Sequence, residues 1–180
     1  MCFDMSQTEI SREYEGGCNC GQLRYRMKTM PLIVQCCHCT WCQRESGSAC
    51  VVNAQIETDQ LAILRGQAHA QKIPSASSSG QTVYKCSDCA VAIFSQYHEA
   101  NPHTLHVRAS TVDRVLVKGV NGHYNMSETR GLDPSVHIFT ATKQNWFIIP
   151  PNTPYFTEFY CREQTLSEQS LARYRALKNN

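Results

Sequence analysis

Eleven cysteines in a chain of 180 residues constrain the fold of this protein more than any other feature of its sequence. Seven of them lie in three short clusters, Cys18-Asn19-Cys20, Cys37-His38-Cys39-Thr40-Trp41-Cys42 and Cys86-Ser87-Asp88-Cys89. These spacings let two or three sulfurs reach one ion, as a tetrahedral zinc site with Zn–S distances of about 2.3 Å requires. We therefore predict zinc, since the spacings typical of ferredoxin-type iron–sulfur motifs are absent. Cys2, Cys50 and Cys161 stand alone, and lone cysteines usually act as small hydrophobes.

Composition and charge favour a folded soluble protein over a nucleic-acid-binding or membrane protein. Hydrophobic residues make up 42% of the chain and charged residues 18%, as in folded soluble proteins. The net charge is only +2, and no basic run suggests a nucleic-acid partner. The longest apolar run, residues 89–94, is far shorter than the roughly 20 residues that span a bilayer. Because the N-terminus shows no secretory signal, we expect a reducing, cytoplasmic location in which disulfides would not persist.

Short segments of alternating polarity predict a mainly β fold. Leu23, Tyr25 and Met27 alternate with basic residues, as in a half-buried strand. Further short stretches rich in β-branched and aromatic residues are bounded by turn residues. These strand candidates are 49–55, 61–64, 69–73, 81–85, 91–95, 104–109, 136–141 and 145–149. A polar segment at 74–80 is expected to be a surface hairpin loop.

The two ends of the chain differ from this pattern. Residues 1–15 are polar and irregular, and we expect a flexible lead-in. Only the C-terminus has a helical pattern, with a capping box at 165–168 and with Leu171 and Tyr174 on one face. The expected organisation is a lead-in at 1–15, a zinc domain at 16–160 and a helix within 161–180 that packs on the same domain.

Cys18, Cys20, Cys86 and Cys89 predict a first, closed metal site. Four sulfurs fill a tetrahedron and leave no open position, which is typical of structural zinc. Such a site would hold two distant segments of the chain together. We therefore expect it to be needed for folding.

The central cluster predicts a second site with three ligands. Alternate side chains of an extended segment share a side, so Cys37 and Cys39 point away from Cys36 and His38. Cys42 can reach the same ion after a turn. Three ligands leave a position for water or substrate, as in catalytic sites. The alternative is a second closed site whose fourth ligand is His38, Cys36 or Cys50.

These motifs resemble the glutathione-dependent formaldehyde-activating enzyme family, whose zinc domain is shared with centromere protein V. The family's G-x-C-x-C-G is similar to residues 16–21, its C-x-C-x-x-C to residues 37–42, and its later C-x-x-C to residues 86–89. A final element is similar to residues 134–138 and 145–147. The resemblance covers residues 16–160. Ala90 departs from it, since the family has glycine there, where glycine would serve backbone conformation.

The resemblance implies the β-tent fold of short antiparallel strands and two Zn²⁺ per chain, on Cys18, Cys20, Cys86 and Cys89 and on Cys37, Cys39 and Cys42. It also implies the activity of a carbon–sulfur lyase similar to S-(hydroxymethyl)glutathione synthase, with a glutathione-like thiol and a small aldehyde such as formaldehyde as partners. The expected partners include no nucleic acid and no membrane, and the sequence leaves the oligomeric state open.

Four residues are candidate substrate contacts. Arg44 follows the central cluster and could hold a carboxylate of glutathione, although a solvated surface arginine is equally common. His137 could assist proton transfer, but a hydrogen-bonded structural histidine is the more frequent role. Trp41 could form the floor of a pocket or pack over the metal, and Lys143 could contact substrate or be solvated.

Two other functions compete with the enzyme. A non-catalytic zinc scaffold would bind a protein partner, as the resemblance to centromere protein V allows. A zinc-ribbon nucleic-acid binder is disfavoured because the chain has no basic stripe.

Overall fold

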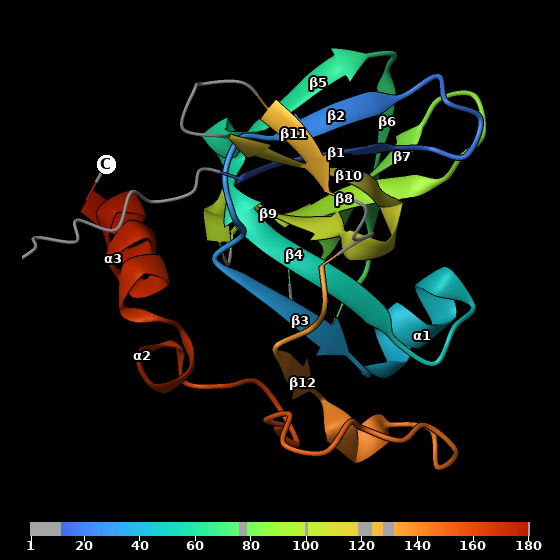
Figure 1. Cartoon of the computed structure of the whole chain (residues 1–180). Helices are drawn as coiled ribbons and strands as arrows, with labels where there is room; N and C mark the ends of the chain where they lie inside the picture. The colour runs from blue at the N-terminus through green and yellow to red at the C-terminus, as the bar shows by residue number, and fades with distance from the viewer. Residues whose placement is uncertain (1–11, 76–78, 100, 119–123, 128–131, 180) are drawn as a thin grey trace, which may run out of the picture.

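The computed structural model describes residues 12–75, 79–99, 101–118, 124–127 and 132–179. In these residues twelve strands form two sheets, and the smaller sheet lies over one side of the larger one (Figure 1). The five-stranded sheet has the order β11-β10-β1-β2-β5. Its strands are β1 (Arg12–Gly17), β2 (Arg24–Met27), β5 (Leu61–Arg65), β10 (Val112–Lys118) and β11 (Tyr124–Ser127).

The larger sheet has seven strands in the order β12-β3-β4-β9-β8-β7-β6. These are β3 (Ile33–Cys37), β4 (Val51–Glu57), β6 (Ala68–Ile73), β7 (Gln81–Cys86), β8 (Ala92–Tyr97), β9 (Asn101–Arg108) and β12 (Val136–Ile138). All pairs in both sheets are antiparallel except β12 with β3, which run parallel. The predicted mainly β fold is confirmed.

The main core contains apolar side chains from both sheets. Leu23, Tyr25 and Met27 are completely buried, as their alternation predicts, and they share one cluster with Ala54 and Ile56 of β4. The intervening arginines lie on the other face of β2. Burial of the apolar face of each sheet against the other stabilises this two-layer arrangement.

A second core lies between the edge strand β12 and the C-terminal region, and it includes Ile33, Ile138, Tyr160 and Tyr174. The α-helices of the described residues are α1 (Thr40–Ser46), α2 (Arg162–Thr165) and α3 (Glu168–Ala176). Short 3₁₀ turns lie at Thr58–Gln60, Ala109–Thr111, Thr140–Thr142 and Leu177–Asn179. No helix in the described residues is long and apolar enough to cross a membrane.

Several expected boundaries differ from the observed ones. Residues 12–15 of the expected lead-in belong to β1, which pairs with β2 and β10, and residues 1–11 lie outside the described residues. The strand expected at 136–141 ends at Ile138, because Phe139 has a left-handed backbone with φ of 55°. Residues 145–149 form no strand, and 145–146 form a turn. The expected hairpin at 74–80 does join β6 to β7, although its residues 76–78 lie outside the described residues.

The helices also differ from expectation. A capping box at 165–168 would start the C-terminal helix near Thr165, but that residue ends α2. Ser167 is the N-cap of α3, and its side chain accepts a hydrogen bond from the backbone N–H of Ser170. Helix α1 has no counterpart in the prediction, because seven residues are too few to display a helical period.

Candidate metal centres and the adjoining cavity

Three clusters of cysteine and histidine side chains in the described residues have the geometry of metal sites. Within each cluster, the sulfur and imidazole nitrogen atoms all lie within 4.8 Å of one another. The first cluster is Cys18, Cys20, Cys86 and Cys89, the second is Cys37, Cys39 and Cys42, and the third is Cys36, His38 and His137.

The first cluster joins the two sheets. Cys18 and Cys20 lie in the turn between β1 and β2, whereas Cys86 and Cys89 lie at the turn between β7 and β8. The Cys18 and Cys20 sulfurs are 3.3 Å apart, and those of Cys20 and Cys86 are 3.8 Å apart. Four sulfurs about 2.3 Å from a tetrahedral zinc would be separated by about 3.8 Å. The four thiols therefore fit zinc in both chemistry and spacing.

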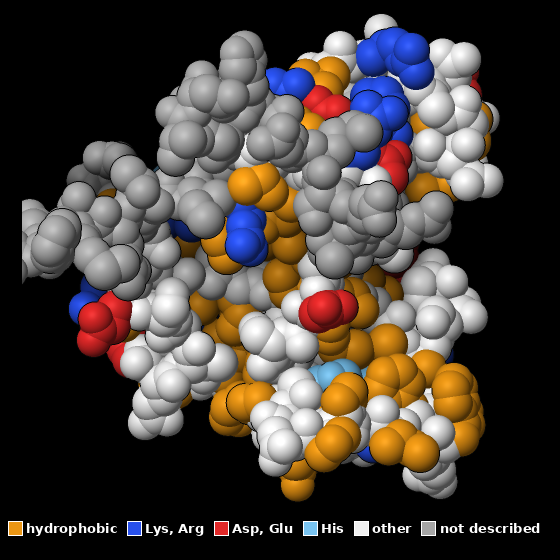
Figure 2. Space-filling model, in the orientation of Figure 1, with side chains coloured by type: hydrophobic (Ala, Val, Ile, Leu, Met, Phe, Trp, Pro, Cys, Tyr) orange, Lys and Arg blue, Asp and Glu red, His pale blue; other side chains and the backbone are white. Residues whose placement is uncertain are grey.

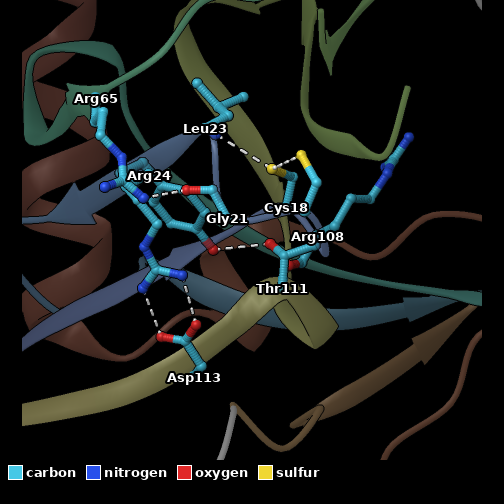
Figure 3. A network of polar contacts seen from close by, with 10 residues as sticks. Cys18, Gly21, Leu23, Arg24, Arg65, Arg108, Thr111 and Asp113 are labelled. Atoms are coloured by element: carbon cyan, nitrogen blue, oxygen red, sulfur yellow. Dashed lines mark hydrogen bonds and ion pairs between the residues drawn. The ribbon is translucent and has the colours of Figure 1, made fainter. Parts of the chain in front are cut away.

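The backbone at this cluster is arranged to favour thiolates. The N–H of Leu23 donates a hydrogen bond of 3.2 Å to the Cys18 sulfur (Figure 3). Backbone hydrogen bonds at Val91 and Cys20 lower the pKa of the Cys89 thiol to about 6. Beside the turn, Arg24 of β2 makes a bidentate ion pair with Asp113 of β10, with distances of 2.7 and 2.8 Å (Figure 3).

The second cluster lies where β3 passes into α1. Cys37 is the last residue of β3, Cys39 is the N-cap of α1, and Cys42 is buried within that helix. The Cys39 sulfur accepts the backbone N–H of Cys42 at 3.4 Å. Hydrogen bonds with the Cys37 and Cys42 thiols lower the pKa of Cys39 to about 2. In the described part of the chain, no fourth cysteine, histidine or acidic donor joins this cluster. Its three sulfurs could therefore hold a metal and leave a coordination position open.

The third cluster lies on the other face of β3. Parallel pairing places His137 of β12 beside Cys36 and Ile138 beside Cys37. Side chains of paired residues share a face of the sheet, and the face alternates along the strand. Cys36 and His38 therefore meet His137, while Cys37 and Cys39 lie on the opposite side with Ile138.

The side chains of the third cluster are deeply buried, and an aromatic ring packs beside them. Burial, with a smaller contribution from His137, lowers the pKa of His38 to about 4, and burial also lowers the pKa of His137. The two rings stack with centroids 5.2 Å apart, and the ring of Phe147 packs edge-on against His38 at 4.7 Å. Both imidazoles are therefore neutral near pH 7, the state in which imidazole binds metals.

A cavity of about 260 Å³ adjoins the second cluster. Its walls are formed by polar groups on β3, β4, β8 and β9, and by aromatic side chains of α1 and of the segment after β12. The described lining residues are Gln35, Cys37, Cys39, Trp41, Cys42, Asn53, Ser75, Ser95, Tyr97, Asn101, His106, Ile138, Phe139, Phe159 and Arg162. The volume of this cavity and its mixture of polar and aromatic lining residues suit a small organic molecule with polar groups.

Arg162 brings positive charge to this cavity. Its guanidinium carbon lies 5.1 Å from the ring centroid of Phe159 and 4.9 Å from that of Tyr174. Its Nε atom is buried and has no hydrogen-bond partner among the described residues. An unsatisfied buried donor is costly, so it is available for an anionic ligand. Sequence reasoning missed Arg162, because it lies 120 residues after Cys42 and no motif surrounds it.

The four expected substrate contacts lie in different places. Trp41 lines the cavity and is 41% exposed. Arg44 is exposed on α1 and is not among the lining residues, and His137 belongs to the third cluster. Lys143 donates hydrogen bonds to the backbone carbonyls of Gln144 and Phe147, at 3.0 and 2.8 Å.

The sequence matches the model of the glutathione-dependent formaldehyde-activating enzyme family over residues 13–142. This span covers more than half of the chain and includes all ten side chains of the three clusters. The chain belongs to this family. Membership supports a formaldehyde-activating, glutathione-related enzymatic function at that coarse level, and the cysteine clusters are compatible with zinc.

Comparisons with individual proteins give no further support for a function. No curated protein sequence matches the chain. A crystal structure of a Rhodobacter sphaeroides protein matches with 17% identity and a TM-score of 0.41, covering 54% of this chain and 85% of that one.

Proposed function

We propose that the protein is a zinc-dependent carbon–sulfur lyase or synthase, which joins a glutathione-like thiol to formaldehyde or a related small aldehyde. The observation that carries this proposal is the position of Cys37, Cys39 and Cys42 in the wall of a cavity of about 260 Å³. Family membership supports the reaction type.

The reaction adds a sulfur nucleophile to a carbonyl carbon. A carbon–sulfur bond forms, the C=O π electrons move to oxygen, and that oxygen takes the proton released by the thiol. A free thiol with a pKa of about 8.5 is only a few per cent ionised at neutral pH, so the site must favour the thiolate. Zinc held by Cys37, Cys39 and Cys42 would stabilise a thiolate and leave one coordination position open.

The remaining cavity residues bind and orient the substrates. Arg162 pairs with a carboxylate of the thiol, since its buried Nε lacks a partner in the described structure. Burial raises the pKa of Tyr97, so its phenol stays protonated and can donate a hydrogen bond to the oxygen that develops negative charge. Phe139 and Phe159 exclude water. Arg44 and His137 lie off the described wall, so the proposal gives them no substrate contact.

Adduct formation from glutathione and formaldehyde tests the reaction. Exchange-resolved NMR of the equilibrating mixture measures formation and cleavage together, at protein concentrations far below those of the substrates. We expect a rate above that of the uncatalysed mixture, proportional to protein concentration. A rate equal to the uncatalysed one, with the second cluster loaded with zinc, would contradict the proposal.

A non-catalytic zinc scaffold is the second candidate, and an exposed apolar surface favours it. Hydrophobic side chains gather over β12 and the segment after it (Figure 2). In that segment Trp146 is 71% exposed, Ile148 85% and Tyr155 64%. Exposed apolar groups that cluster often contact a protein partner.

A further inference from the structure

We propose that Cys36, His38 and His137 form a third metal site for a tetrahedral ion of the zinc class. The proposal does not depend on the proposed reaction, because these side chains lie on the face of β3 opposite the second cluster. It would raise the metal content to three ions per chain.

The distances between donor atoms carry the proposal. The Cys36 sulfur lies 3.6 Å from Nε2 of His38, and that nitrogen lies 2.9 Å from Nδ1 of His137. With Zn–S of about 2.3 Å and Zn–N of about 2.0–2.1 Å, tetrahedral ligands are separated by about 3.5 Å for S···N and about 3.3 Å for N···N. One ion can therefore reach all three atoms after small shifts.

Burial favours these donors as ligands. Cys36, His38 and His137 are each at most 1% exposed, and Phe147 packs against both rings. Polar donors that are withdrawn from water need a strong compensating partner. A set of sulfur and imidazole donors in tetrahedral geometry is typical of zinc.

Cys50 directly precedes β4, whose Val52 is paired with Cys36, but it does not belong to the group of three donors. The protein therefore supplies one sulfur and two imidazole nitrogens. The fourth position of a tetrahedral ion would be left to a small ligand such as water.

The site would also fix β12 to the sheet. This strand has only three residues, and the segment that follows it contributes Phe139 and Phe159 to the cavity wall. An ion held by His137 on one strand and by Cys36 on the next would link them more strongly than three ladder pairs can.

Metal content per chain tests the proposal. Full-length protein is loaded with zinc under reducing conditions, dialysed and analysed by inductively coupled plasma mass spectrometry. His137→Gln should hold one ion fewer than the wild type, because it removes one of the three donors. His103→Gln and Cys161→Ser, which replace exposed residues outside the clusters, should match the wild type.

The alternative is a simple hydrogen bond between the two imidazoles, which a separation of 2.9 Å also allows. In that case a folded His137→Gln variant keeps the wild-type metal content, and the proposal is overturned. If the variant does not fold, an anomalous difference map of wild-type crystals at the zinc edge decides. A peak between Cys36, His38 and His137 supports the site, and its absence in zinc-loaded crystals refutes it.

Discussion

Gly21 and Ala90 occupy corresponding places after the two cysteine pairs of the first cluster, and both have a left-handed backbone, with φ of 75° and 59°. In both turns the backbone N–H bonds back to a carbonyl of the preceding pair, from Gly21 to Cys18 at 3.1 Å and from Ala90 to Cys86 at 2.9 Å. Glycine adopts this conformation without cost, whereas alanine is strained there by roughly 1 kcal/mol.

Ala90→Gly should therefore stabilise the protein by about 1 kcal/mol, since Ala90 is exposed and its methyl group contributes little packing. Urea unfolding of zinc-loaded protein measures the change. Gly21→Ala is the matched control, and it should lower stability by a similar amount, because a methyl group there meets only the end of Arg65. A loss of stability in Ala90→Gly would show that the strain argument is mistaken.

Cys86→Ser should give insoluble or unfolded protein. Structural zinc contributes on the order of 10 kcal/mol of apparent folding free energy, comparable with the whole stability of a domain. Circular dichroism and metal analysis of the soluble fraction measure the effect. Cys161→Ser, at an exposed cysteine outside the clusters, should behave as wild type. Unchanged melting and metal content in Cys86→Ser would remove the structural role of the first cluster.

The variant Cys42→Ser distinguishes a catalytic role of the second cluster from a purely structural one. If the second cluster is catalytic, the variant stays folded, holds one ion fewer and forms adduct at the uncatalysed rate. If the second cluster is only structural, the variant becomes insoluble as Cys86→Ser does. Solubility, metal content and the adduct assay, measured on the same preparation, distinguish these outcomes.

Arg162→Gln should raise KM for glutathione about tenfold or more, which corresponds to the loss of one charge-assisted hydrogen bond, and should leave kcat within about twofold. The exposed Arg175→Gln is the control and should change neither constant. With 2-mercaptoethanol, which has no carboxylate, Arg162→Gln and wild type should have equal KM. An equal rise for both thiols would mean that Arg162 does not bind the carboxylate.

His106 should make the protein less stable in mild acid. Burial, with help from Arg108 and Arg162, lowers its pKa from 6.5 to about 3, so the unfolded chain binds a proton that the folded chain excludes. Stability is then complete above about pH 6.5 and falls as pH decreases toward 3, by about 2 kcal/mol at pH 5.

Replacement of His106 by glutamine should reduce this acid sensitivity. The difference in unfolding free energy between pH 7 and pH 5 should be about 2 kcal/mol smaller in His106→Gln than in wild type, with zinc content checked at both values. Identical losses in the two proteins would exclude His106 as the titrating group.

Local patterns predicted much of this fold, because strand alternation and turn residues are local properties. Tyr25 and Met27 of β2, and Leu23 directly before it, are buried as their spacing indicates. Strand parity also separates Cys37 from Cys36 on opposite faces of one strand. Strand β10 shows no such alternation, because two polar residues, Asp113 and Arg114, are followed by three apolar ones at 115–117.

The positions of His137 and Arg162 could not be predicted from the sequence, because they depend on contacts between segments far apart in the chain. His137 meets His38, 99 residues earlier, only because β12 adds to the edge of the sheet in parallel register. Arg162 reaches the cavity through packing of its guanidinium between Phe159 and Tyr174. The cavity residues on β3, β4, β8 and β9 are all distant from Arg162 in the chain, so no short-range pattern places Arg162 or His137 at these sites.

The two faces of β3 carry donors at successive positions, Cys36 on one side and Cys37 on the other. Slippage of this strand by a single residue would turn every donor to the wrong side and dismantle both neighbouring centres at once. Insertions and deletions should therefore be tolerated in the 74–80 loop but not within Ile33–Cys37, so a scan of one-residue insertions would map β3 as the least permissive stretch of the chain.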